Sequence, residues 1–453
     1  MIGRRRQRRV EGGPGRRRWR ARGAWRVWLT LGVALVAVLG SGRWNPMRDG
    51  IVRGSRHALA TIRFNPRLWH FGAAWARTAD VRVALSDRDG DLTPDRPISA
   101  DRVVHVQVVL DGASWLSWWP GDIDQLQAVV RTPVAPSLAE PVEAVLAGQP
   151  VTIRLSRAAT AVRGTSLSGS RTLTLGPVRS GAVLTWGRTR PGVAGAGRVD
   201  LDIESRPWLA SSHEALCWVA IPQHTIVGLQ EMLADLDYLP VGWSAVRACQ
   251  AGKDRDTGAA GFYWRWPDTP TGIRSAWSPG AYTVATQGAV IQFERVHGLK
   301  ISWLPSRGFW HALASAWRAG QRDPDPYTYV RVTERLPETL RLWRNGRTIL
   351  TSLANTGKAP TVTRIGTFPV DLRRTHQVMT GIGPSGKPYR YPDVRWISYF
   401  KGSEAIHAFP RAAYGFPQSA GCVELPTATA DRVWHDLHYG TLVAVESAGT
   451  RSA

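Results

Sequence analysis

The spacing of apolar residues changes twice along this 453-residue chain, and that change constrains the fold more than any other feature. Apolar and polar residues alternate in runs such as 81–85 and 151–155, which is the period of a β-strand. From Ile226 to Leu236 apolar residues recur at helical spacing instead. Alternation returns after 327, where Asn345-Gly346 is the strongest hairpin signal. We therefore predict a multidomain, mainly β protein with a helical part in the middle.

Residues 80–205 are expected to form one β-rich domain resembling a sandwich. Short alternating runs are separated there by Pro and Gly clusters, and Asp111-Gly112 closes one run as a hairpin. No residues in this stretch form a catalytic pattern. The simplest interpretation is a spacer between the N-terminal segment and the rest of the chain.

The N-terminal segment predicts a membrane anchor. Eleven of the first 26 residues are Arg, and residues 27–42 that follow are uncharged and mostly apolar. Arg on the N-terminal side of an apolar segment predicts that this end stays in the cytoplasm. We therefore expect a basic cytoplasmic tail over 1–26, a signal anchor forming a transmembrane helix over 27–42, and a linker over 43–79. A cleaved signal peptide is the alternative, although no clear cleavage site follows. Both interpretations export the remaining chain.

The net charge of +23 does not by itself indicate nucleic-acid binding. The densest basic run adjoins the apolar segment, and no zinc-finger, helix-turn-helix or RNA-binding signature follows it. The cations are mostly Arg, in a chain rich in Ala, Gly, Pro and Trp, which is the bias of a GC-rich bacterial genome. We expect no nucleic-acid partner.

The three cysteines divide into a pair and a single thiol. An odd count in an exported chain suggests one disulfide and one free thiol. Cys217 and Cys249 lie on either side of a predicted helix and form the natural pair, which leaves Cys422 free. No second Cys or close His flanks Cys422 at ligand spacing, so we expect no metal site.

The helical part, taken as 213–320, is expected to contain helices near 226–236, 283–297 and 306–319. Its blocks at 228–242 and 288–299 resemble the three-helix peptidoglycan-binding module of wall enzymes. A Trp- and Gly-rich insertion at 250–280 departs from that pattern. Its residues Trp264, Trp266 and Trp277 could stack on sugar rings or pack the insertion onto the helices. A polar, Pro-bearing linker at 321–326 precedes the last domain, which spans 327–447.

The last domain contains a His and a Cys in a suggestive order. Cys422 follows His407 by fifteen positions, directly after Gly421. A free cysteine thiol titrates near ~8.5, so a nucleophilic thiol needs a base or a positive field. A glycine allows a tight turn whose backbone N–H groups converge on a developing oxyanion. This spacing alone is a weak signal.

The stretch 328–446 resembles the YkuD-type L,D-transpeptidase domain, whose signature is His, a spacer, then Ser/Thr-His-Gly-Cys. His407, Ser419, Gly421 and Cys422 match it, and the supporting blocks are 363–370, 379–381, 393–396 and 439–443. Three departures stand out: Ala420 replaces the second His, only eleven residues separate His407 from Ser419, and Glu424 replaces an Arg or Asn.

The resemblance implies a cysteine-dependent acyltransferase of peptidoglycan that needs no cofactor. It implies that Cys422 is the nucleophile, ionised beside the base His407, and that the N–H groups of Gly421 and Cys422 stabilise the oxyanion. Ser419, the remaining catalytic candidate, could support the turn or act chemically. The expected substrate contacts are Met379, Tyr389 or Tyr391 as the family tyrosine that faces the substrate, and Arg411, which could bind a stem carboxylate or be a solvated loop residue. The implied partners are donor and acceptor stem peptides, joined by a 3→3 cross-link.

Two alternatives remain open at this point. The same thioester could be hydrolysed, which would make the protein an L,D-carboxypeptidase on stem tetrapeptides. Alternatively, Ala420 could mark an inactive peptidoglycan-binding adaptor. We expect a monomer anchored in the cell membrane, with its catalytic domain outside the cytoplasm in the cell wall.

Overall fold

The computed structural model describes residues 50–79, 81–114, 123–166, 172–191, 193–251 and 260–449. The tail predicted over 1–26 and the anchor predicted over 27–42 lie outside these residues. Within these ranges, none of the helices combines the length and apolarity that a membrane crossing requires. The same ranges are mainly β, with six helices. They divide into two compact units, one ending at Ala135 and including Arg206–Ala210, the other formed by Pro136–Ser205 and Ser211 onward.

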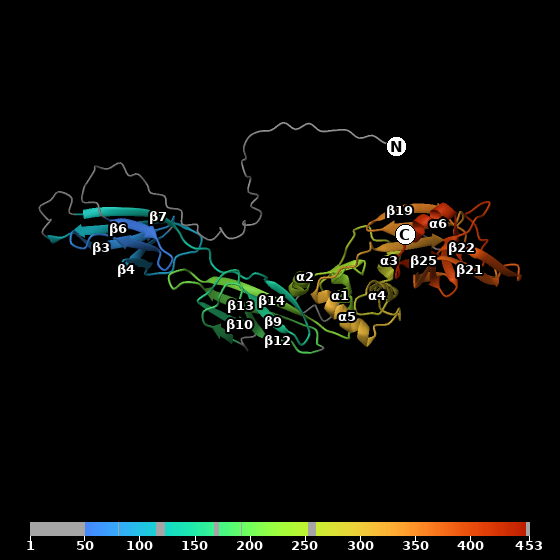
Figure 1. Ribbon diagram of the computed structural model, residues 1–453, viewed down its shortest axis with the longest axis horizontal. Coiled ribbons are helices and arrows are strands. Elements are labelled where there is room, and N and C mark those ends of the chain that lie inside the picture. The colour runs from blue at the N-terminus through green and yellow to red at the C-terminus, as the bar shows by residue number, and fades with distance from the viewer. Residues whose placement is uncertain are drawn as a thin grey trace, which may run out of the picture. The chain divides into compact units, whose positions relative to one another are not determined.

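The first unit is a seven-stranded antiparallel sheet, coloured blue to cyan in Figure 1. Its order is β1-β2-β5-β4-β3-β6-β7, and its strands are β1 (Ile51–Gly54), β2 (Ala60–Arg63), β3 (Trp69–Arg77), β4 (Arg82–Arg88), β5 (Asp91–Pro94), β6 (Val103–Gly112) and β7 (Ile123–Arg131). Every second residue of β6 from Val104 to Leu110 is fully buried in its core. The strict alternation of the sequence therefore places one face of the sheet in the core.

The linker predicted over 43–79 is wrong for residues 51–77, because β1, β2 and β3 lie there. Ala60, Ile62 and Trp69 are almost completely buried in the core of the first unit. β2 has only four residues, and a register shift beside Gly72 interrupts β3, so the alternation is too brief to stand out in the sequence.

The second unit begins with another β-structure. A five-stranded sheet has the order β11-β10-β13-β14-β8, and β12 pairs with β9. The strands are β8 (Val142–Leu146), β9 (Pro150–Arg154), β10 (Ala161–Ser166), β11 (Thr172–Leu175), β12 (Val183–Arg188), β13 (Gly195–Glu204) and β14 (Ser212–Ile221). The prediction of one sandwich over 80–205 is therefore wrong. Periodicity finds strands, but it does not reveal which strands share a core.

The helical part follows β14 in the chain and is also linked to it by a disulfide. Its elements are α1 (Ile226–Asp235), β15 (Val241–Trp243), α2 (Ala245–Gln250), β16 (Phe262–Trp264), α3 (Thr271–Ser275), α4 (Val284–Val296) and α5 (Arg307–Arg318). Thr225 caps α1 by accepting from Gly228 N at 3.1 Å. Cys217 of β14 forms a disulfide with Cys249 of α2. This bridge links the second β-structure to the helices.

The three tryptophans of the insertion pack against the protein. Trp264 and Trp277 meet edge to face with centroids 5.8 Å apart. Trp266 packs against Trp343 of the last domain at 5.2 Å. Together they line a core that includes Tyr329 and Leu442 of that domain. The packing alternative is the one that the structure shows.

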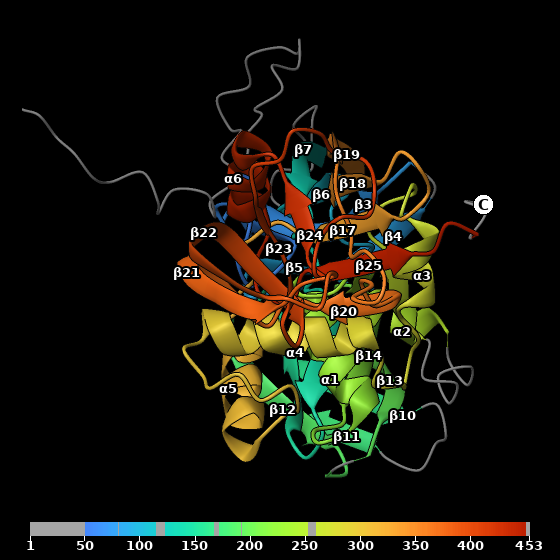
Figure 2. The same ribbon diagram turned by 90° about the vertical axis from the view of Figure 1, so that its right-hand side faces the viewer.

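Residues 321–326 are held by hydrogen bonds to the helical part rather than forming a free linker. The side-chain amide of Gln292 in α4 donates to Asp323 Oδ1 at 3.1 Å and to Asp325 Oδ2 at 2.8 Å. Asp323 N donates to Leu236 O at 2.8 Å. Figure 2 shows α4 lying directly against β20 and β25. The helical part and the last domain therefore form one packed body.

The last domain consists of two sheets and one helix. The first sheet has the order β19-β18-β17-β25-β20, with β17 (Thr328–Thr333), β18 (Thr339–Arg344), β19 (Arg347–Leu353), β20 (Gly366–Pro369) and β25 (Leu442–Glu446). The second has the order β21-β22-β23-β24, with β21 (Leu372–Ile382), β22 (Pro388–Lys401), β23 (Glu404–Ala408) and β24 (Val423–Leu425). Helix α6 (Thr427–Asp436) follows β24, and one core joins both sheets to it.

Candidate active site

Two short parallel strands position the sequence-predicted histidine and cysteine. In the β23–β24 pair, His407 lies opposite Glu424, and Ile406 lies opposite Val423. Ile406 and Val423 are buried in the domain core. Because side chains alternate along a strand, His407 and Glu424 share the opposite face with Ala405. Cys422, the residue directly before β24, packs against Ala405. The pairing of β23 with β24 thus brings together two residues, His407 and Cys422, that lie fifteen positions apart in the sequence.

The turn before Cys422 is closed by a serine side chain. Ser419 Oγ donates to Cys422 O at 2.6 Å and accepts from Gly421 N at 3.1 Å. Gly421 adopts φ +112°, a conformation that a side chain would strain. Thr363 Oγ1 donates to Gly421 O at 3.0 Å. Ser419 therefore supports the turn.

This geometry changes the expected set of oxyanion donors. The N–H of Gly421 is already committed to Ser419 Oγ. The N–H of Cys422 has no acceptor among the residues that the structure describes. A donor aimed at an oxyanion must be free until the charge develops. Cys422 N–H remains a suitable donor, and the expectation for Gly421 N–H is wrong in this turn.

The sulfur of Cys422 is protonated at rest, contrary to the expectation of an ionised thiol. Its S–H donates to Ser403 O at 3.6 Å. Burial raises the pKa of the Cys422 thiol to about 12, and the carboxylates of Glu424 and Glu404 add to this rise. The hydrogen bond from the Ala405 backbone lowers this pKa, by less than burial raises it but by more than either carboxylate does. Attack by this sulfur therefore needs a base to remove its proton.

His407 has the protonation state of a base. Burial lowers the pKa of the His407 imidazole, so the ring is neutral near pH 7. Nδ1 lies 3.0 Å from Ala408 O, which can only accept a hydrogen bond. We therefore assign the proton to Nδ1, which leaves the lone pair on Nε2. A neutral imidazole near Cys422 can accept the thiol proton.

Three of the expected substrate contacts lie on the hairpin formed by β21 and β22. Met379 pairs with Tyr391 across the hairpin, and the rings of Tyr391 and Tyr389 stack at 4.9 Å. Burial raises the pKa of Tyr389, and the nearby Cys422 adds to this rise. Tyr389 therefore lies within electrostatic reach of the thiol, and both residues pack against the same hydrophobic cluster.

Arg411 has a partner inside the protein. Its Nε and Nη2 donate to the two carboxylate oxygens of Glu424, each at 2.8 Å. A guanidinium engaged in this way is not free to bind a stem carboxylate through the same edge. The substrate role expected for Arg411 is not supported by its position.

Sequence reasoning missed two residues of the site and misjudged a third. Burial raises the pKa of Tyr399, followed by the charge of Cys422, so Tyr399 also faces the thiol. Glu404 accepts from Arg364 N at 3.0 Å and contributes to the raised pKa of Cys422. Glu424 was recognised only as a departure from the family pattern. The odd numbering of Tyr389, Tyr391 and Tyr399 could have signalled a shared face, but bulges in the strands obscure it.

Metal ligands do not gather in this part of the molecule. Within the described ranges, no three His, Cys, Asp or Glu side chains lie close enough to hold a metal ion.

Comparison with known proteins agrees with the geometry. A neutral histidine on β23 and a free cysteine directly before the paired strand β24 are the groups that a cysteine-dependent enzyme requires. Residues 327–445 match the family model YkuD, described as the L,D-transpeptidase catalytic domain. This part of the chain is therefore an L,D-transpeptidase catalytic domain.

Solved structures similar to this chain include three L,D-transpeptidases. The catalytic domain from E. faecium is 24% identical, with 26% of this chain and 96% of that chain covered and a TM-score of 0.24. The enzyme from Mycobacterium smegmatis is 13% identical, with 69% and 100% covered and a TM-score of 0.24. The one from Stackebrandtia nassauensis is 19% identical, with 35% and 76% covered and a TM-score of 0.21. No curated protein sequence matches the chain.

Proposed function

We propose that this protein forms 3→3 cross-links in peptidoglycan through a thioester on Cys422. The observation that carries the proposal is the placement of a neutral His407 on β23 and of Cys422 directly before the paired strand β24, inside the L,D-transpeptidase domain. The aromatic hairpin with Tyr389 and Tyr391 stands beside Cys422 and offers a flat surface to an extended peptide.

The first half-reaction transfers the donor stem to the enzyme. Cys422 Sγ attacks the carbonyl of the third stem residue while its proton passes to His407 Nε2. The bond to the terminal D-Ala breaks, and its amine leaves with the proton from His407. The N–H of Cys422 donates to the oxyanion while the tetrahedral carbon exists. The product is a thioester.

The second half-reaction releases the donor onto an acceptor. A side-chain amine of a neighbouring stem attacks the thioester carbonyl and loses a proton to His407. The C–S bond breaks, and the sulfur takes the proton back from His407. The new amide is the 3→3 cross-link. If water attacked instead, the product would be a tripeptide monomer.

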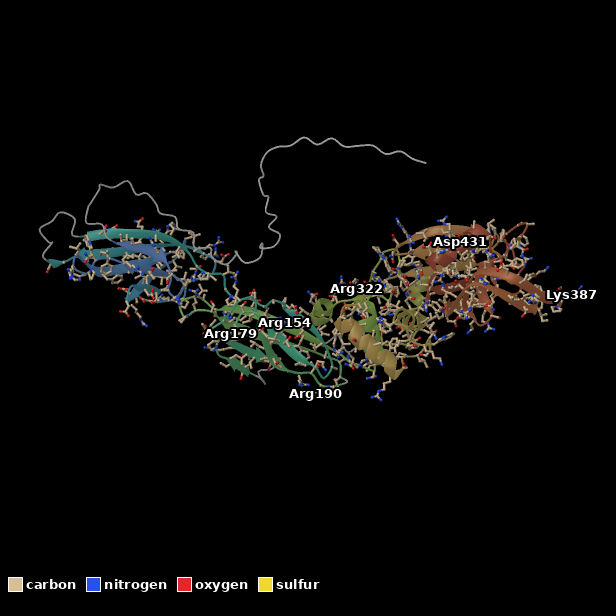
Figure 3. All side chains as sticks on the ribbon, in the orientation of Figure 1. Arg154, Arg179, Arg190, Arg322, Lys387 and Asp431 are labelled. Atoms are coloured by element: carbon tan, nitrogen blue, oxygen red, sulfur yellow. A yellow bond between two sulfur atoms is a disulfide. The ribbon has the colours of Figure 1, made fainter. Side chains whose placement is uncertain are left out.

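The test uses the full chain and tetrapeptide muropeptides, with products identified by mass. Cross-linked dimers are expected with the unmodified chain and none with Cys422→Ala. Asp431→Asn, on the exposed surface of α6 (Figure 3), is the control that should retain full activity. Tripeptide monomers without dimers would identify an L,D-carboxypeptidase. An unmodified Cys422 after incubation with a carbapenem, together with no product, would identify an inactive adaptor.

We further propose that the protein is anchored in the cell membrane and holds this domain in the wall. The basic run and the apolar segment 27–42 support the anchor, and the resemblance of 228–242 and 288–299 supports a peptidoglycan-binding role for the helical part. Fractionation should recover the full chain with membranes and a chain lacking 1–42 without them. Purified sacculi should retain the Cys422→Ala chain, and failure to retain it would remove the binding role.

A further inference from the structure

Next to the candidate catalytic pair, the structure contains an ion pair with no assigned role. Glu424 and Arg411 make two parallel hydrogen bonds of 2.8 Å each. The Glu424 side chain is only 5% exposed and that of Arg411 26%. Surface ion pairs contribute little to stability, but a buried carboxylate needs its partner because an unpaired buried charge is costly. This pair is therefore fixed in its geometry.

Glu424 is positioned by β24, the strand that begins directly after Cys422. It lies opposite His407 in the β23–β24 register, and its backbone exchanges hydrogen bonds with Asn355 in both directions, at 2.9 and 3.0 Å. The carboxylate therefore cannot move along the strand without breaking this ladder. Directly opposite side chains in paired strands are neighbours.

Arg411 is positioned by the loop that follows the histidine. Its N–H donates to Tyr414 Oη at 3.1 Å, and Tyr414 Oη donates to Phe409 O at 2.7 Å. The guanidinium lies 4.5 Å from the ring centroid of Phe409. The pair with Glu424 thus fastens the loop from Phe409 to Tyr414 onto the catalytic sheet.

Phe409 connects this fastened loop to the catalytic groups. Its ring meets that of His407 edge to face at 6.1 Å and that of Tyr391 at 4.7 Å. A displacement of Arg411 would therefore move the aromatic wall that holds the imidazole. Displacements near 1 Å at catalytic groups can cost about a hundredfold in rate.

The two charges of the pair also act on His407 in opposite senses. The carboxylate of Glu424 raises the pKa of His407, and the guanidinium of Arg411 lowers it. With both present, these effects oppose one another, and burial keeps the ring neutral. Removing either charge would therefore shift the pKa of His407.

We propose that the Glu424–Arg411 ion pair positions His407 as the base for Cys422. It does so by holding the 409–414 loop against the imidazole and by placing one negative and one positive charge beside the ring. The inference rests on the proposed function for its purpose, but its physical content concerns only the reactivity of the thiol.

The test measures the rate of Cys422 alkylation by iodoacetamide against pH in the full chain. The acid limb of this profile, where the rate falls at low pH, reports the protonation of His407. Glu424 and Arg411 are the charged groups that face this ring. The alkaline limb reports the thiol, which Glu404, Glu424, Tyr389 and Tyr399 face. The variants are Glu424→Gln, Arg411→Gln, the double variant and Arg411→Lys. Arg331→Gln and Glu446→Gln are the matched controls, because Arg331 and Glu446 form a similar ion pair in the other sheet, with three hydrogen bonds of 2.7–2.9 Å.

The expected result is a pair of opposite shifts. Glu424→Gln should move the acid limb to lower pH and Arg411→Gln should move it to higher pH, each by about half a unit. The double variant should return the limb toward its original position with a rate at pH 7 about tenfold lower, since the loop is no longer fastened. Arg411→Lys keeps the charge and should keep the limb in place, with only partial loss of rate.

Three outcomes would overturn the inference. They are equal shifts in both single variants, no shift in either, or equal effects in the Arg331 and Glu446 controls. The double variant keeps the test decisive if one single variant fails to fold. If the shifts occur but no variant or unmodified chain makes dimers, the proposed function fails and this inference stands.

Discussion

Gly288 of α4 and Gly440 of the turn before β25 pack backbone against backbone. A Cβ atom on Gly288 would lie 2.5 Å from Gly440 O, and one on Gly440 would collide with Gly288 O. Figure 2 shows helix α4 lying against β20 and β25. Only glycine allows the helical part and the catalytic domain to approach this closely.

The first prediction follows from that contact. In an exposed helix, Gly→Ala stabilises by up to ~1 kcal/mol, because alanine loses less backbone freedom on folding. Gly288→Ala should instead destabilise by about 1–3 kcal/mol, because the added carbon overpacks the interface. Thermal unfolding of the full chain measures the difference. Gly308→Ala in α5, where a Cβ would meet nothing closer than 3.8 Å, is the control and should not destabilise. Equal effects of the two changes would contradict the close packing.

The second prediction concerns Glu404 and the alkaline side of thiol reactivity. Glu404 contributes to the raised pKa of Cys422, so removing its charge should lower that pKa and increase the thiolate fraction. Glu404→Gln keeps an oxygen that can accept from Arg364 N. Iodoacetamide should modify Cys422 of Glu404→Gln several times faster than in the unmodified chain above pH 8. Glu446→Gln, in the other sheet, should leave the rate unchanged. A slower reaction in Glu404→Gln would show that the carboxylate assists the thiol.

The third prediction concerns the pH dependence of stability. Burial raises the pKa of Asp323 to about 6 from an ordinary value of 3.8. The folded protein therefore holds this proton more tightly than the unfolded chain. The resulting stabilisation is complete below about pH 3.8 and is lost as pH rises through about 6.

Asp323→Asn tests whether protonated Asp323 stabilises the fold and whether this stabilisation is lost as pH rises. Asparagine resembles the protonated acid and keeps an oxygen that accepts from Gln292 and from Asp325 N. The fall in unfolding temperature between pH 4 and 7 should be smaller in Asp323→Asn than in the unmodified chain. Asp268→Asn, at an exposed position, should retain the full fall. An unchanged slope in Asp323→Asn would assign the pH dependence to other groups.

The fourth prediction concerns the disulfide. Closing the loop between Cys217 and Cys249, at a separation of 32 residues, should stabilise by ~3–4 kcal/mol in the loop-entropy description. Replacing both cysteines by serine should lower the unfolding temperature accordingly. Without reductant, denatured protein should bind one iodoacetamide equivalent, at Cys422, and three after reduction. Three equivalents without reductant would show that the bridge does not form.

The sequence predicted individual helices and strands better than it predicted which of them pack together in one core. The helical spacing from Ile226 corresponds to α1, and the alternation from Val104 corresponds to β6, because both patterns arise within a single element. The division of the β-rich part into two units depends on which strands share a core. Sequence periodicity carries no such information.

The same distinction applies to the site. His407 and Cys422 could be named from a motif, because Ser419, Gly421 and several supporting blocks follow the family pattern in the same order. The ion pair of Glu424 with Arg411 joins a strand to a loop, and no local pattern announces it. The protonated state of the thiol depends on burial, which only the folded arrangement determines.

The aromatic layer of Trp266, Tyr327 and Trp343 has a consequence for how this enzyme could be cut or recombined. Severing the chain within 321–326 would leave Trp343 and Leu442 facing water, because their packing partners lie upstream. A fragment beginning at β17 would expose an apolar surface that promotes aggregation. The smallest transplantable piece must therefore include the helices, and gene fusions that exchange this catalytic part should carry them along.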